Sequence, residues 1–539
     1  KKDEESDNLD EEIKKFDFKI EPCKKQILVS AFTNRAVDNI VEKLVEDRPE
    51  LQIIRVGNTA SMTATARTCS LQSACEISIK DSENEKKVVY SPAKARKALE
   101  DADIIASTCL GCGNQIFKHI SFDYVIIDEA GQLIEPAALI PMMKADRVIL
   151  IGDDKQLPPI STDMENPKFN KDFFAQKNYL RDPNKINHLI SASEISIAKR
   201  RQVWDMTLSK IRLKRDDTLS TSIFQRLRRI LGTTDRYTAF QQQYRMNQKI
   251  SDFVSEIFYE NKIVPGISQG KNIGERTIRD FFKEKGLSTG LIGRCENSLI
   301  QFLFDADHPL IFLDTKVLDP KDSKLEQRYE EIGSRFNTEE ADIIANAIVE
   351  FFRVLLSSDE TDIERISSEI SKDIGVITPY RAQVRLIRQK IRSFLNDHDG
   401  IMNTLSDNIM VNTVDKFQGR EAEIIIISLV DSNPARELSI LHEEVRRINV
   451  SITRAKTKVI LIGNSLMFGE KEKTDAQDGK MAQPKYKHPK NLVDFIHQAE
   501  KQQEQSEFEM KNDIYAVLRA FVDFAKTNNG YRILSKRDL

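Results

Sequence analysis

The chain has 539 residues, of which 40% are hydrophobic and 31% are charged, and its formal net charge at pH 7 is -3. This length predicts more than one domain, and this composition describes a globular protein and excludes a membrane protein. Its apolar runs are strand-sized, well short of the roughly 18 residues that a membrane-spanning helix needs. The net charge argues against a protein that coats nucleic acid indiscriminately, but it leaves room for a local basic groove.

Residues 1–25 are charged with alternating sign, which predicts a solvated tail. After them, short β-branched runs recur, and each ends in a polar or glycine-containing cluster. Because these runs are apolar without alternation, we expect strands that are buried on both faces, as in parallel sheets. The expected strands lie near residues 26–34, 51–58, 102–111, 124–130, 147–153, 309–315, 374–380, 409–415, 423–431 and 458–464.

Helical patterns separate several of these strands, for example at residues 35–47 and 338–356. Alternating strands and helices predict an α/β fold with parallel sheets. The strands fall into two clusters, so we expect two such domains with helical insertions. The expected boundaries are 1–25 for the tail, 26–237 for the first domain with insertions near 59–100 and 161–220, 238–465 for the second domain with an insertion near 261–307, and 466–539 for a polar loop and a helical C-terminal tail.

Acidic residues follow two neighbouring strands of the first cluster. Asp128 and Glu129 end the run "YVIIDEA", and "LIGDDKQLPPI" follows about twenty residues later. Ligands of a parallel sheet bind beyond the carboxyl ends of its strands. A carboxylate there can hold magnesium, and its neighbour can accept the proton of a water that attacks a γ-phosphate. We therefore expect Asp128 to be a magnesium ligand and Glu129 to be a base. We expect Gln156, at the end of the adjacent strand, to sense the γ-phosphate.

The cysteines and one basic segment have less specific interpretations. The six cysteines are scattered, which fits a reducing compartment, cytoplasmic or, in a eukaryote, nuclear. Cys109 and Cys112 form a C-x-x-C pair without a second pair at metal spacing, so we favour a strand-end loop over a redox or zinc site. Residues 195–229 carry ten Lys or Arg against three Asp, which suits either phosphate contacts or a solvated helix face.

The pairing of "IIDEAGQ" with "IGDDKQLPPI" resembles motifs II and III of the superfamily 1 helicases of group B, a family that includes RNA helicases of the up-frameshift type and DNA replication helicase/nucleases. Six further segments resemble motifs of this family in the same order. They are "SAFTNRAVDNI", "ASTCLG", "FQQQYRMNQKI", "VITPYRAQV", "NTVDKFQGREAEIIIIS" and "RRINVSITRAKTKVILIGN". The resemblance covers roughly residues 26 to 465, and it implies two RecA-like domains in tandem that bind ATP and magnesium.

The resemblance also assigns roles on the nucleotide. Arg245 and Arg454 would act as arginine fingers, since a guanidinium stabilises the charge that develops on the triphosphate. Tyr244 would stack on adenine. Gly419 would permit close approach of the backbone. Glu421 would accept a hydrogen bond from the ribose or from a partner in the other domain.

A second set of residues would hold the nucleic acid strand. These residues are small and polar, aromatic or basic, they end expected strands, and such side chains contact phosphate and sugar without reading the base sequence. The set is Thr33, Asn34, Thr108, Pro379, Tyr380, Arg381 and Thr413. Thr33 and Asn34 also suit the cap of the helix that follows them.

The chain departs from the family in one respect. A phosphate-binding loop of the form G-x-x-x-x-G-K-[ST] is expected before residue 26, but the sequence contains none. Its two Gly-Lys pairs, at 270–271 and 479–480, lie downstream and are followed by Asn272 and Met481. Three explanations compete: a loop upstream in a longer protein, which we favour, a pseudo-helicase that binds without hydrolysis, or a loop supplied by a separate polypeptide.

The expected function is an ATP-dependent helicase or translocase on a single strand, with the 5′ to 3′ polarity implied by group membership alone. Segments such as "TSIFQRL" and "VNTVDKFQGR" resemble the DNA enzymes more than the RNA enzymes, so we favour single-stranded DNA as the partner. A nuclease domain or partner upstream would accord with this resemblance. The alternatives are an RNA helicase of the up-frameshift type and a non-hydrolysing nucleic-acid-binding protein, since contacts to the backbone leave the 2′-hydroxyl preference open.

Overall fold

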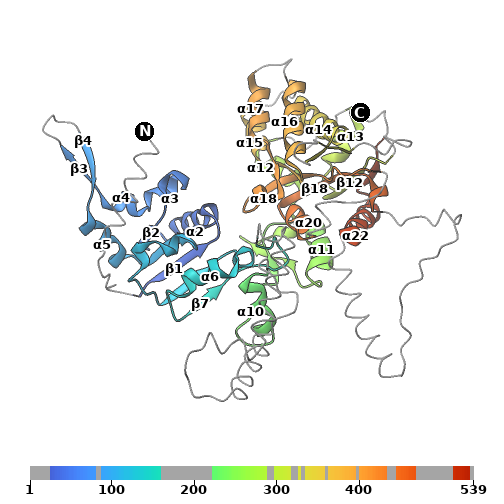
Figure 1. The fold of residues 1–539 in the computed structure, drawn as a ribbon. Coiled ribbons are helices and arrows are strands. Elements are labelled where there is room, and N and C mark those ends of the chain that lie inside the picture. Colours follow the sequence, from blue (N-terminus) through green and yellow to red (C-terminus); the bar gives the residue numbers. More distant parts are fainter. Residues whose placement is uncertain are drawn as a thin grey trace, which may run out of the picture. The chain divides into compact units, whose positions relative to one another are not determined.

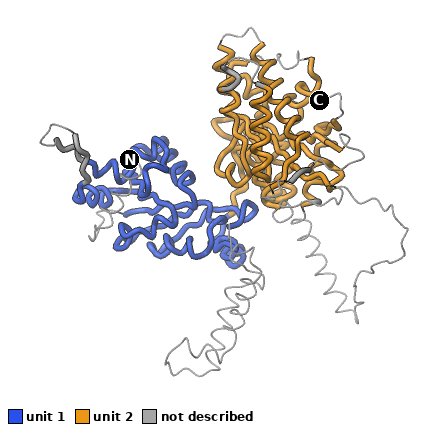
Figure 2. Tube along the Cα trace, turned by 45° about the horizontal axis from the view of Figure 1, so that its top comes forward, with its two compact units in different colours: residues 1–238 blue, residues 239–539 orange. Residues whose placement is uncertain are grey.

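The structure, a computed structural model, describes residues 25–80, 86–159, 221–287, 296–316, 326–328, 334–357, 362–395, 400–433, 445–468 and 514–534. The expected N-terminal tail up to residue 24 and the insertion near 161–220 lie outside the described residues. Within the described ranges, no helix is long and apolar enough to cross a membrane. The chain divides into two compact units, residues 1–238 and 239–539 (Figure 2).

Unit 1 is built on a five-stranded sheet with the order β2-β5-β1-β6-β7 (Figure 1). Every pairing in this sheet is parallel, and the five strands are the first five that the sequence predicts. Ala31 pairs with Thr108 and Ser30 pairs with Ile127, so the carboxyl ends of β1, β5 and β6 lie at one edge. The bounds are β1 (Ile27–Ala31), β2 (Ile53–Arg55), β5 (Ile104–Thr108), β6 (Tyr124–Ile127) and β7 (Val148–Leu150).

Helices follow the strands of unit 1. Thr33 caps α2 (Asn34–Asp47) by accepting a hydrogen bond from the amide of Ala36 at 3.1 Å, which confirms the expected cap. Proline opens α5 (Pro92–Asp101) and α6 (Glu135–Met142), where a missing N–H removes no hydrogen bond. The last described helix of the unit is α10 (Ile223–Leu231).

The region 59–100 is only partly helical, although we had expected a helical insertion there. It contains the short helices α3 (Ala64–Thr68) and α4 (Leu71–Cys75), but an antiparallel hairpin of β3 (Glu76–Lys80) and β4 (Lys86–Tyr90) follows them. The first strand, "EISIK", alternates polar and apolar side chains, and the second, "KKVVY", ends in β-branched and aromatic residues; both features favour a strand over a helix.

Unit 2 is built on a six-stranded sheet with the order β16-β15-β17-β18-β12-β19, again parallel throughout. Five of these strands are the second cluster that the sequence predicts, so the α/β class with two parallel sheets is confirmed. The bounds are β12 (Leu310–Asp314), β15 (Ile374–Thr378), β16 (Met410–Thr413), β17 (Ala422–Ser428), β18 (Ala455–Gly463) and β19 (Tyr531–Ile533).

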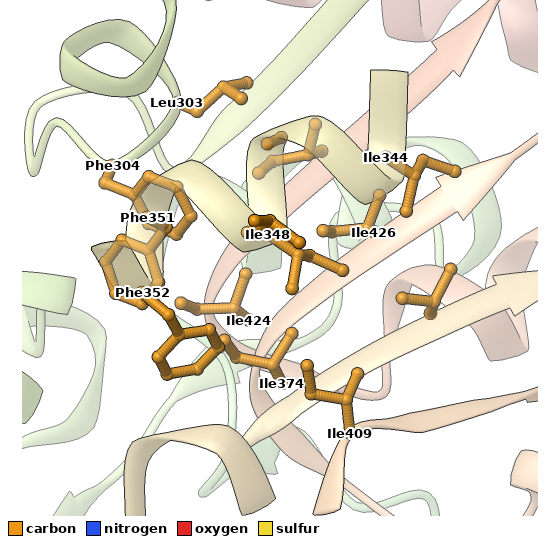
Figure 3. Close-up of a cluster of buried hydrophobic side chains, with 14 of the residues drawn as sticks. Leu303, Phe304, Ile344, Ile348, Phe351, Phe352, Ile374, Ile409, Ile424 and Ile426 are labelled. Atoms are coloured by element: carbon orange, nitrogen blue, oxygen red, sulfur yellow. The ribbon is translucent and has the colours of Figure 1, made fainter. Parts of the chain in front are cut away.

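The sheet of unit 2 is covered by helices whose apolar faces pack on it (Figure 3). In that core, Ile344 and Ile348 of α14 lie among side chains of the sheet that include Ile424 and Ile426. Phe351 of the same helix stacks on Phe304 with ring centroids 4.0 Å apart. The helices are α11 (Gln248–Phe258), α12 (Ile278–Glu284), α13 (Ser298–Leu303), α14 (Thr338–Leu356), α15 (Ile363–Lys372), α16 (Arg381–Leu395), α17 (Gly400–Asn408), α18 (Val414–Phe417), α20 (Arg446–Ile452) and α22 (Ile514–Thr527).

Short strands fill the remaining described parts of unit 2. They form three two-stranded sheets, and the segment expected as a mixed insertion near 261–307 contains three of the strands together with α12 and α13. The bounds are β8 (Gln242–Gln243), β9 (Val264–Pro265), β10 (Ile267–Ser268), β11 (Lys271–Asn272), β13 (Glu326–Arg328) and β14 (Arg335–Asn337).

Residues 514–534 contain a helix, as expected for the C-terminal tail, but they pack on the sheet of unit 2 and add a strand to it. The helix α22 buries one apolar face, and the strand β19 then pairs with β12 at the edge of the sheet. The hydroxyl of Tyr531 in β19 donates to the carboxylate of Asp314 at 2.6 Å. The strand was missed because it is only three residues long and includes the charged Arg532.

Candidate functional site

The two acids of unit 1 stand at the carboxyl end of β6. Asp128 follows this strand directly, its amide donates to the carbonyl of Ser30 at 2.8 Å, and its Oδ1 accepts from the amide of Glu129 at 2.9 Å. Burial raises the pKa of Asp128 above its ordinary value, although the amide of Glu129 opposes that shift. Glu129 has a φ of 52°, in the left-handed region that residues other than glycine rarely adopt. This turn ends the strand at the acids.

The loops after β6 and β7 touch through their main chains. A Cβ on Gly131 would come within 2.8 Å of the carbonyl oxygen of Asp153, and a Cβ on Gly152 within 2.9 Å of the amide nitrogen of Gly131. The amide of Ala130 donates to the carbonyl of Ile151 at 2.9 Å. The glycines of "DEAG" and "IGDD" therefore allow the loop with Asp128 and Glu129 to lie against the loop with Asp153.

We had expected Gln156 to end the adjacent strand, but it does not. The strand β7 ends at Leu150, and Gln156 lies in the loop that follows. Its Nε2 donates to Oδ2 of Asp153 at 3.1 Å. The error has a simple cause: "RVILIGDD" reads as one apolar run, but the contact of Gly152 with the neighbouring loop ends regular pairing early. Gln156 is nevertheless connected to the loop that touches the acidic turn.

The described end of the basic segment is engaged in ion pairs within unit 1. Arg228 pairs with Asp154, and Arg226 pairs with Glu135 of α6. These two arginines therefore hold α10 to α6 and to the loop after β7, which is neither the phosphate contact nor the solvated helix face that the sequence left open. The rest of the segment, residues 195–220, lies outside the described residues.

Three strand-contact candidates of unit 1 lie together at the carboxyl edge of its sheet. Thr33 and Asn34 begin α2 two and three residues after β1 ends, and Thr108 ends β5, paired with Ala31. Phe32 and Leu110 are exposed apolar side chains directly beside them. Phe32 and Leu110 were not predicted from the sequence, although an apolar residue directly after a strand end, within a motif, is a pattern that could have identified them.

Cys109 and Cys112 lie in the loop after β5, and both are buried in the core of unit 1. Burial raises the pKa of Cys109 to about 11 and that of Cys112 to about 12, so both are thiols at neutral pH. The hydroxyl of Ser30 contacts the sulfur of Cys109 at 3.2 Å. Among the described residues there is no group of three or more His, Cys, Asp or Glu that could hold a metal ion.

The nucleotide-site candidates Glu421 and Arg454 of unit 2 lie at the amino ends of strands β17 and β18. Nε of Arg245 donates to Oε2 of Glu421 at 2.7 Å, and its Nη1 donates to the carbonyl of Thr453 at 3.1 Å. Glu421 directly precedes β17, and Thr453 lies two residues before β18. Both strands run away from this cluster.

Glu421 forms two ion pairs inside unit 2. Besides Arg245, it binds Nζ of Lys456 at 2.7 Å. Burial works to raise the pKa of Glu421, but the two cations outweigh it and hold the pKa below its ordinary value. In this structure the carboxylate therefore anchors Arg245, and the expected hydrogen bond from the ribose or from a partner in the other domain stays a prediction.

Arg454 is also held inside unit 2. The residue is only 4% exposed, and its Nε donates to the carbonyl of Val450 at 3.1 Å. A role on the triphosphate would require this side chain to leave its pocket. Gly419 has a φ of 73°, a left-handed conformation that favours glycine. No atom lies near its Cβ position, which leaves room for a ligand.

Tyr244 presents one face of its ring to solvent. It is 57% exposed, and its hydroxyl donates to Oε1 of Gln242 at 2.8 Å. Gly266 lies against the same ring, since a Cβ there would come within 2.4 Å of its Cε1. A fixed, half-exposed aromatic ring of this kind is suited to stacking on a planar base.

The strand-contact candidates of unit 2 lie at the opposite, carboxyl end of the sheet, but not all face outward. Tyr380, which we had expected to contact the phosphate and sugar of the strand, is 6% exposed, and its hydroxyl donates to Oδ1 of Asp431 at 2.9 Å. Thr413 is buried, and Pro379 is half-buried. Arg381, the first residue of α16, is exposed. Of this set, Arg381 is therefore the side chain best placed for a phosphate.

Asp128 fits a magnesium ion bound through oxygen ligands. One of its carboxylate oxygens accepts the Glu129 amide, and the described residues provide no hydrogen bond to the other. Magnesium in nucleotide sites typically binds one or two carboxylates together with phosphate oxygens and water. A single available carboxylate oxygen at a strand end meets that requirement.

Comparisons with known proteins find two matching family models and several similar proteins. A family model described as "AAA domain" matches residues 219–466, and a second model with the same description matches residues 12–96 and 85–163. The DNA replication ATP-dependent helicase/nuclease of Xenopus laevis is 26% identical over 449 residues, and that of Homo sapiens is 27% identical over 443 residues. Each alignment covers 82% of this chain and 33% of the relative.

An uncharacterized ATP-dependent helicase of Methanocaldococcus jannaschii is 26% identical over 509 residues, covering 82% of this chain and 61% of that protein. The chain thus spans a third of the length of the vertebrate relatives. Among solved structures, an arterivirus nonstructural protein 10, a helicase, is 9% identical with a TM-score of 0.30 and covers 85% of this chain and 56% of that one.

Two parallel α/β domains of the RecA-like type, in tandem, define the class of this protein. The acids after β6, the glycine contact with the loop after β7, and the ordered motifs of both units are all present. The chain belongs to the superfamily 1 helicases of group B.

Proposed function

We propose that the protein containing this chain is an ATP-dependent helicase or translocase that moves 5′ to 3′ on single-stranded DNA. The main-chain contact between the loops after β6 and β7 is the observation that supports this most strongly, because it fixes the acidic turn of Asp128 and Glu129 beside the loop of Asp153 and Gln156. The names of the relatives, ATP-dependent helicases and helicase/nucleases, support the same reading.

In the proposed reaction, Asp128 would hold magnesium, which supplies positive charge to the phosphate oxygens. Glu129 would accept the proton of the attacking water, and its position directly after Asp128 suits that role. Gln156 would respond to the γ-phosphate, and its hydrogen bond to Asp153 would pass a change at the phosphate to the loop that touches the acidic turn.

Unit 2 would contribute the base and charge contacts. Tyr244 would stack on adenine with its exposed face, and Arg245 and Arg454 would stabilise charge on the phosphates. Glu421 would hold Arg245, and Gly419 would leave room for the ribose. Because the sequence contains no G-x-x-x-x-G-K-[ST] loop, we propose that the phosphate cradle comes from residues outside these 539, in the same or another polypeptide.

The strand would be held through its backbone by Thr33, Asn34 and Thr108 in unit 1 and by Arg381 in unit 2, where Pro379 and the buried Thr413 lie at the same carboxyl end of the sheet. Such contacts tolerate any base sequence. We favour DNA over RNA from the motif resemblance. We also place the protein in the cytoplasm or, in a eukaryote, the nucleus, where single-stranded DNA arises.

The test is strand displacement by the full-length protein that contains this chain. Partial duplexes with a 5′ or a 3′ single-stranded overhang, in DNA and in RNA, are incubated with ATP and magnesium. The proposal expects displacement only from the 5′ overhang and faster on DNA. Displacement only from RNA would favour the up-frameshift type.

A second candidate, a non-hydrolysing nucleic-acid-binding protein, is favoured by the missing phosphate loop. It predicts tight oligonucleotide binding that ATP does not change, with no displacement from any of these substrates. Measuring oligonucleotide affinity with and without ATP in the same preparation separates the two candidates.

A further inference from the structure

A fully buried ion pair lies beside the first residue of α2. Nε of Arg55, in β2, donates to Oδ1 of Asp38, in α2, at 2.9 Å, and both side chains are 0% exposed. Nη1 of Arg55 donates to the carbonyl of Val56 at 2.6 Å, and Oδ2 of Asp38 accepts from the amide of Thr63 at 2.9 Å. Burying two charges is costly, and these additional hydrogen bonds are what make the pair tolerable.

The third branch of the guanidinium reaches Asn34. Nη2 of Arg55 donates to Oδ1 of Asn34 at 2.8 Å. A guanidinium can only donate, so the oxygen of the Asn34 amide must face Arg55 and the nitrogen must face away from it. Among the described residues, Nδ2 of Asn34 has no hydrogen-bond partner. Arg55 therefore converts an amide that could turn either way into a donor of fixed direction.

The neighbouring groups also present donors. Thr33 is exposed, and because its Oγ1 accepts from the amide of Ala36, the hydroxyl proton remains free to donate outward. The amino end of α2 adds the partial positive charge of a helix start. A ligand that meets this surface must therefore offer acceptor oxygens.

We propose that Arg55 is a positioning residue that holds the Asn34 amide with its nitrogen outward, as a donor to a phosphodiester or sugar oxygen of the bound strand. This inference rests on the proposed function, which places a strand at Asn34. An apolar pair in place of Arg55 and Asp38 could fill the same space at equal or greater stability, but it would leave the amide free to turn.

The most direct test replaces the donor and keeps the contact with Arg55. Asn34→Asp retains an oxygen for Nη2, and a carboxylate in the first turn of a helix is favourable, so the fold is expected to keep its stability. Binding of a fluorescein-labelled (dT)20 oligonucleotide, measured by anisotropy on the full-length protein, is expected to weaken at least about tenfold, because a donor becomes an anion. Unchanged binding by a folded Asn34→Asp protein would overturn the proposal.

The positioning role itself is tested by a double-mutant cycle. Arg55→Lys keeps the charge beside Asp38 but cannot also reach Val56 and Asn34, and we expect oligonucleotide binding to weaken about three- to tenfold. The slope of log K against log salt should stay unchanged, because Arg55 is buried and touches no phosphate. Adding Arg55→Lys to Asn34→Ala should cost no further affinity. If the two effects multiply instead, Arg55 does not act through Asn34 and the proposal fails.

Arg67→Lys is the matched control. Arg67 donates to the carbonyls of Thr59 and Met62 on the loop that also contacts Asp38, but it makes no contact with Asn34. This variant should bind as the unaltered protein does, and weakening equal to that of Arg55→Lys would attribute the effect to the loop. If the unaltered protein binds no oligonucleotide, the proposed function fails first. If it binds but the Asn34 variants bind equally well, only this inference fails.

Discussion

Gly131 lies against the carbonyl oxygen of Asp153, so closely that a Cβ on Gly131 would stand 2.8 Å from it. Gly152 makes the reciprocal approach, with its Cβ position 2.9 Å from the amide nitrogen of Gly131. Two loops that follow adjacent strands are therefore joined without any side chain between them. This contact explains why glycine stands at both positions and how the acidic turn is coupled to the loop of Gln156.

Gly131→Ala is therefore expected to destabilise unit 1. The atom it would meet is a backbone oxygen that cannot swing aside, so one of the loops must move, at a cost of about 1–3 kcal/mol. Urea denaturation, monitored by far-UV circular dichroism, measures this loss of stability. Gly113→Ala is the control, because its Cβ would meet only a methyl group of Ile140 at 3.8 Å. Equal midpoints for the two variants would show that the loops are not in the contact described.

Gly266→Ala should weaken ATP binding while leaving unit 2 stable. The new Cβ would lie 2.4 Å from the ring of Tyr244, and because that side chain is half exposed it would rotate away rather than unfold the unit. We expect the KM for ATP to rise about tenfold, as for Tyr244→Ala, since the stacking surface is lost. Tyr244→Phe keeps the ring and removes only the hydrogen bond to Gln242, so its KM should change little. A KM unchanged in Gly266→Ala would speak against stacking on Tyr244.

Glu340 should make unit 2 less stable as the pH rises. It is buried in α14, and its Oε2 accepts from the hydroxyl of Ser428 at 2.6 Å and from the amide of Val430 at 3.0 Å. Burial raises the pKa of Glu340 from 4.5 to about 8, against the effect of these donors. Between those two pH values the folded protein holds a proton that the unfolded chain has lost, so stability is full below pH 4.5 and falls as the pH approaches 8.

The matching measurement is the free energy of unfolding between pH 5 and pH 8. Loss of a proton on unfolding lowers it by up to about 1.4 kcal/mol for each pH unit. Glu340→Gln remains neutral and should flatten this dependence. Glu350→Gln, on the same helix but partly exposed, should retain it. Identical slopes for all three proteins would contradict a protonated Glu340.

Truncation after residue 513 should destabilise unit 2 severely. The removed helix α22 buries Val517, Leu518 and Phe521 almost completely, and the removed strand β19 covers the edge of β12. The truncated protein is expected to bind a hydrophobic dye and to lose its cooperative unfolding transition. Tyr531→Phe, which removes only the hydroxyl bond to Asp314, should cost about 1 kcal/mol and keep the transition. A truncated protein as stable as the full chain would show that the C-terminal strand is dispensable.

The strands of both sheets could be predicted because parallel strands buried on both faces give continuous apolar runs, as in "EIIIIS" for β17. The position of Asp128 followed from the same rule. By contrast, β19 was missed because three residues at a sheet edge bury too little apolar surface to show a pattern. The hairpin β3–β4 was missed because the segment 59–100 is polar overall, and this average composition predicted a helical insertion.

Side-chain direction was the part that the sequence could not provide. Tyr380 was expected to face the strand, but Asp431, 51 residues away in the chain, holds its hydroxyl in the interior. Glu421 was expected to accept from the ribose or from the other domain, and the sequence did not indicate its ion pairs with Arg245 and Lys456. Such choices depend on partners that only the fold brings close, and local motifs do not record them.

The central claim, that these residues belong to an ATP-driven motor on single-stranded DNA, is tested most directly by ATP hydrolysis of the full-length protein with and without (dT)20. We predict that the oligonucleotide stimulates hydrolysis, and that Glu129→Gln lowers the stimulated rate at least about a hundredfold, as expected when a general base is lost. Glu135→Gln, at an acid paired with Arg226, should leave the rate near that of the unaltered protein. A rate that is indifferent to the oligonucleotide, or equal in Glu129→Gln and the unaltered protein, would contradict the account.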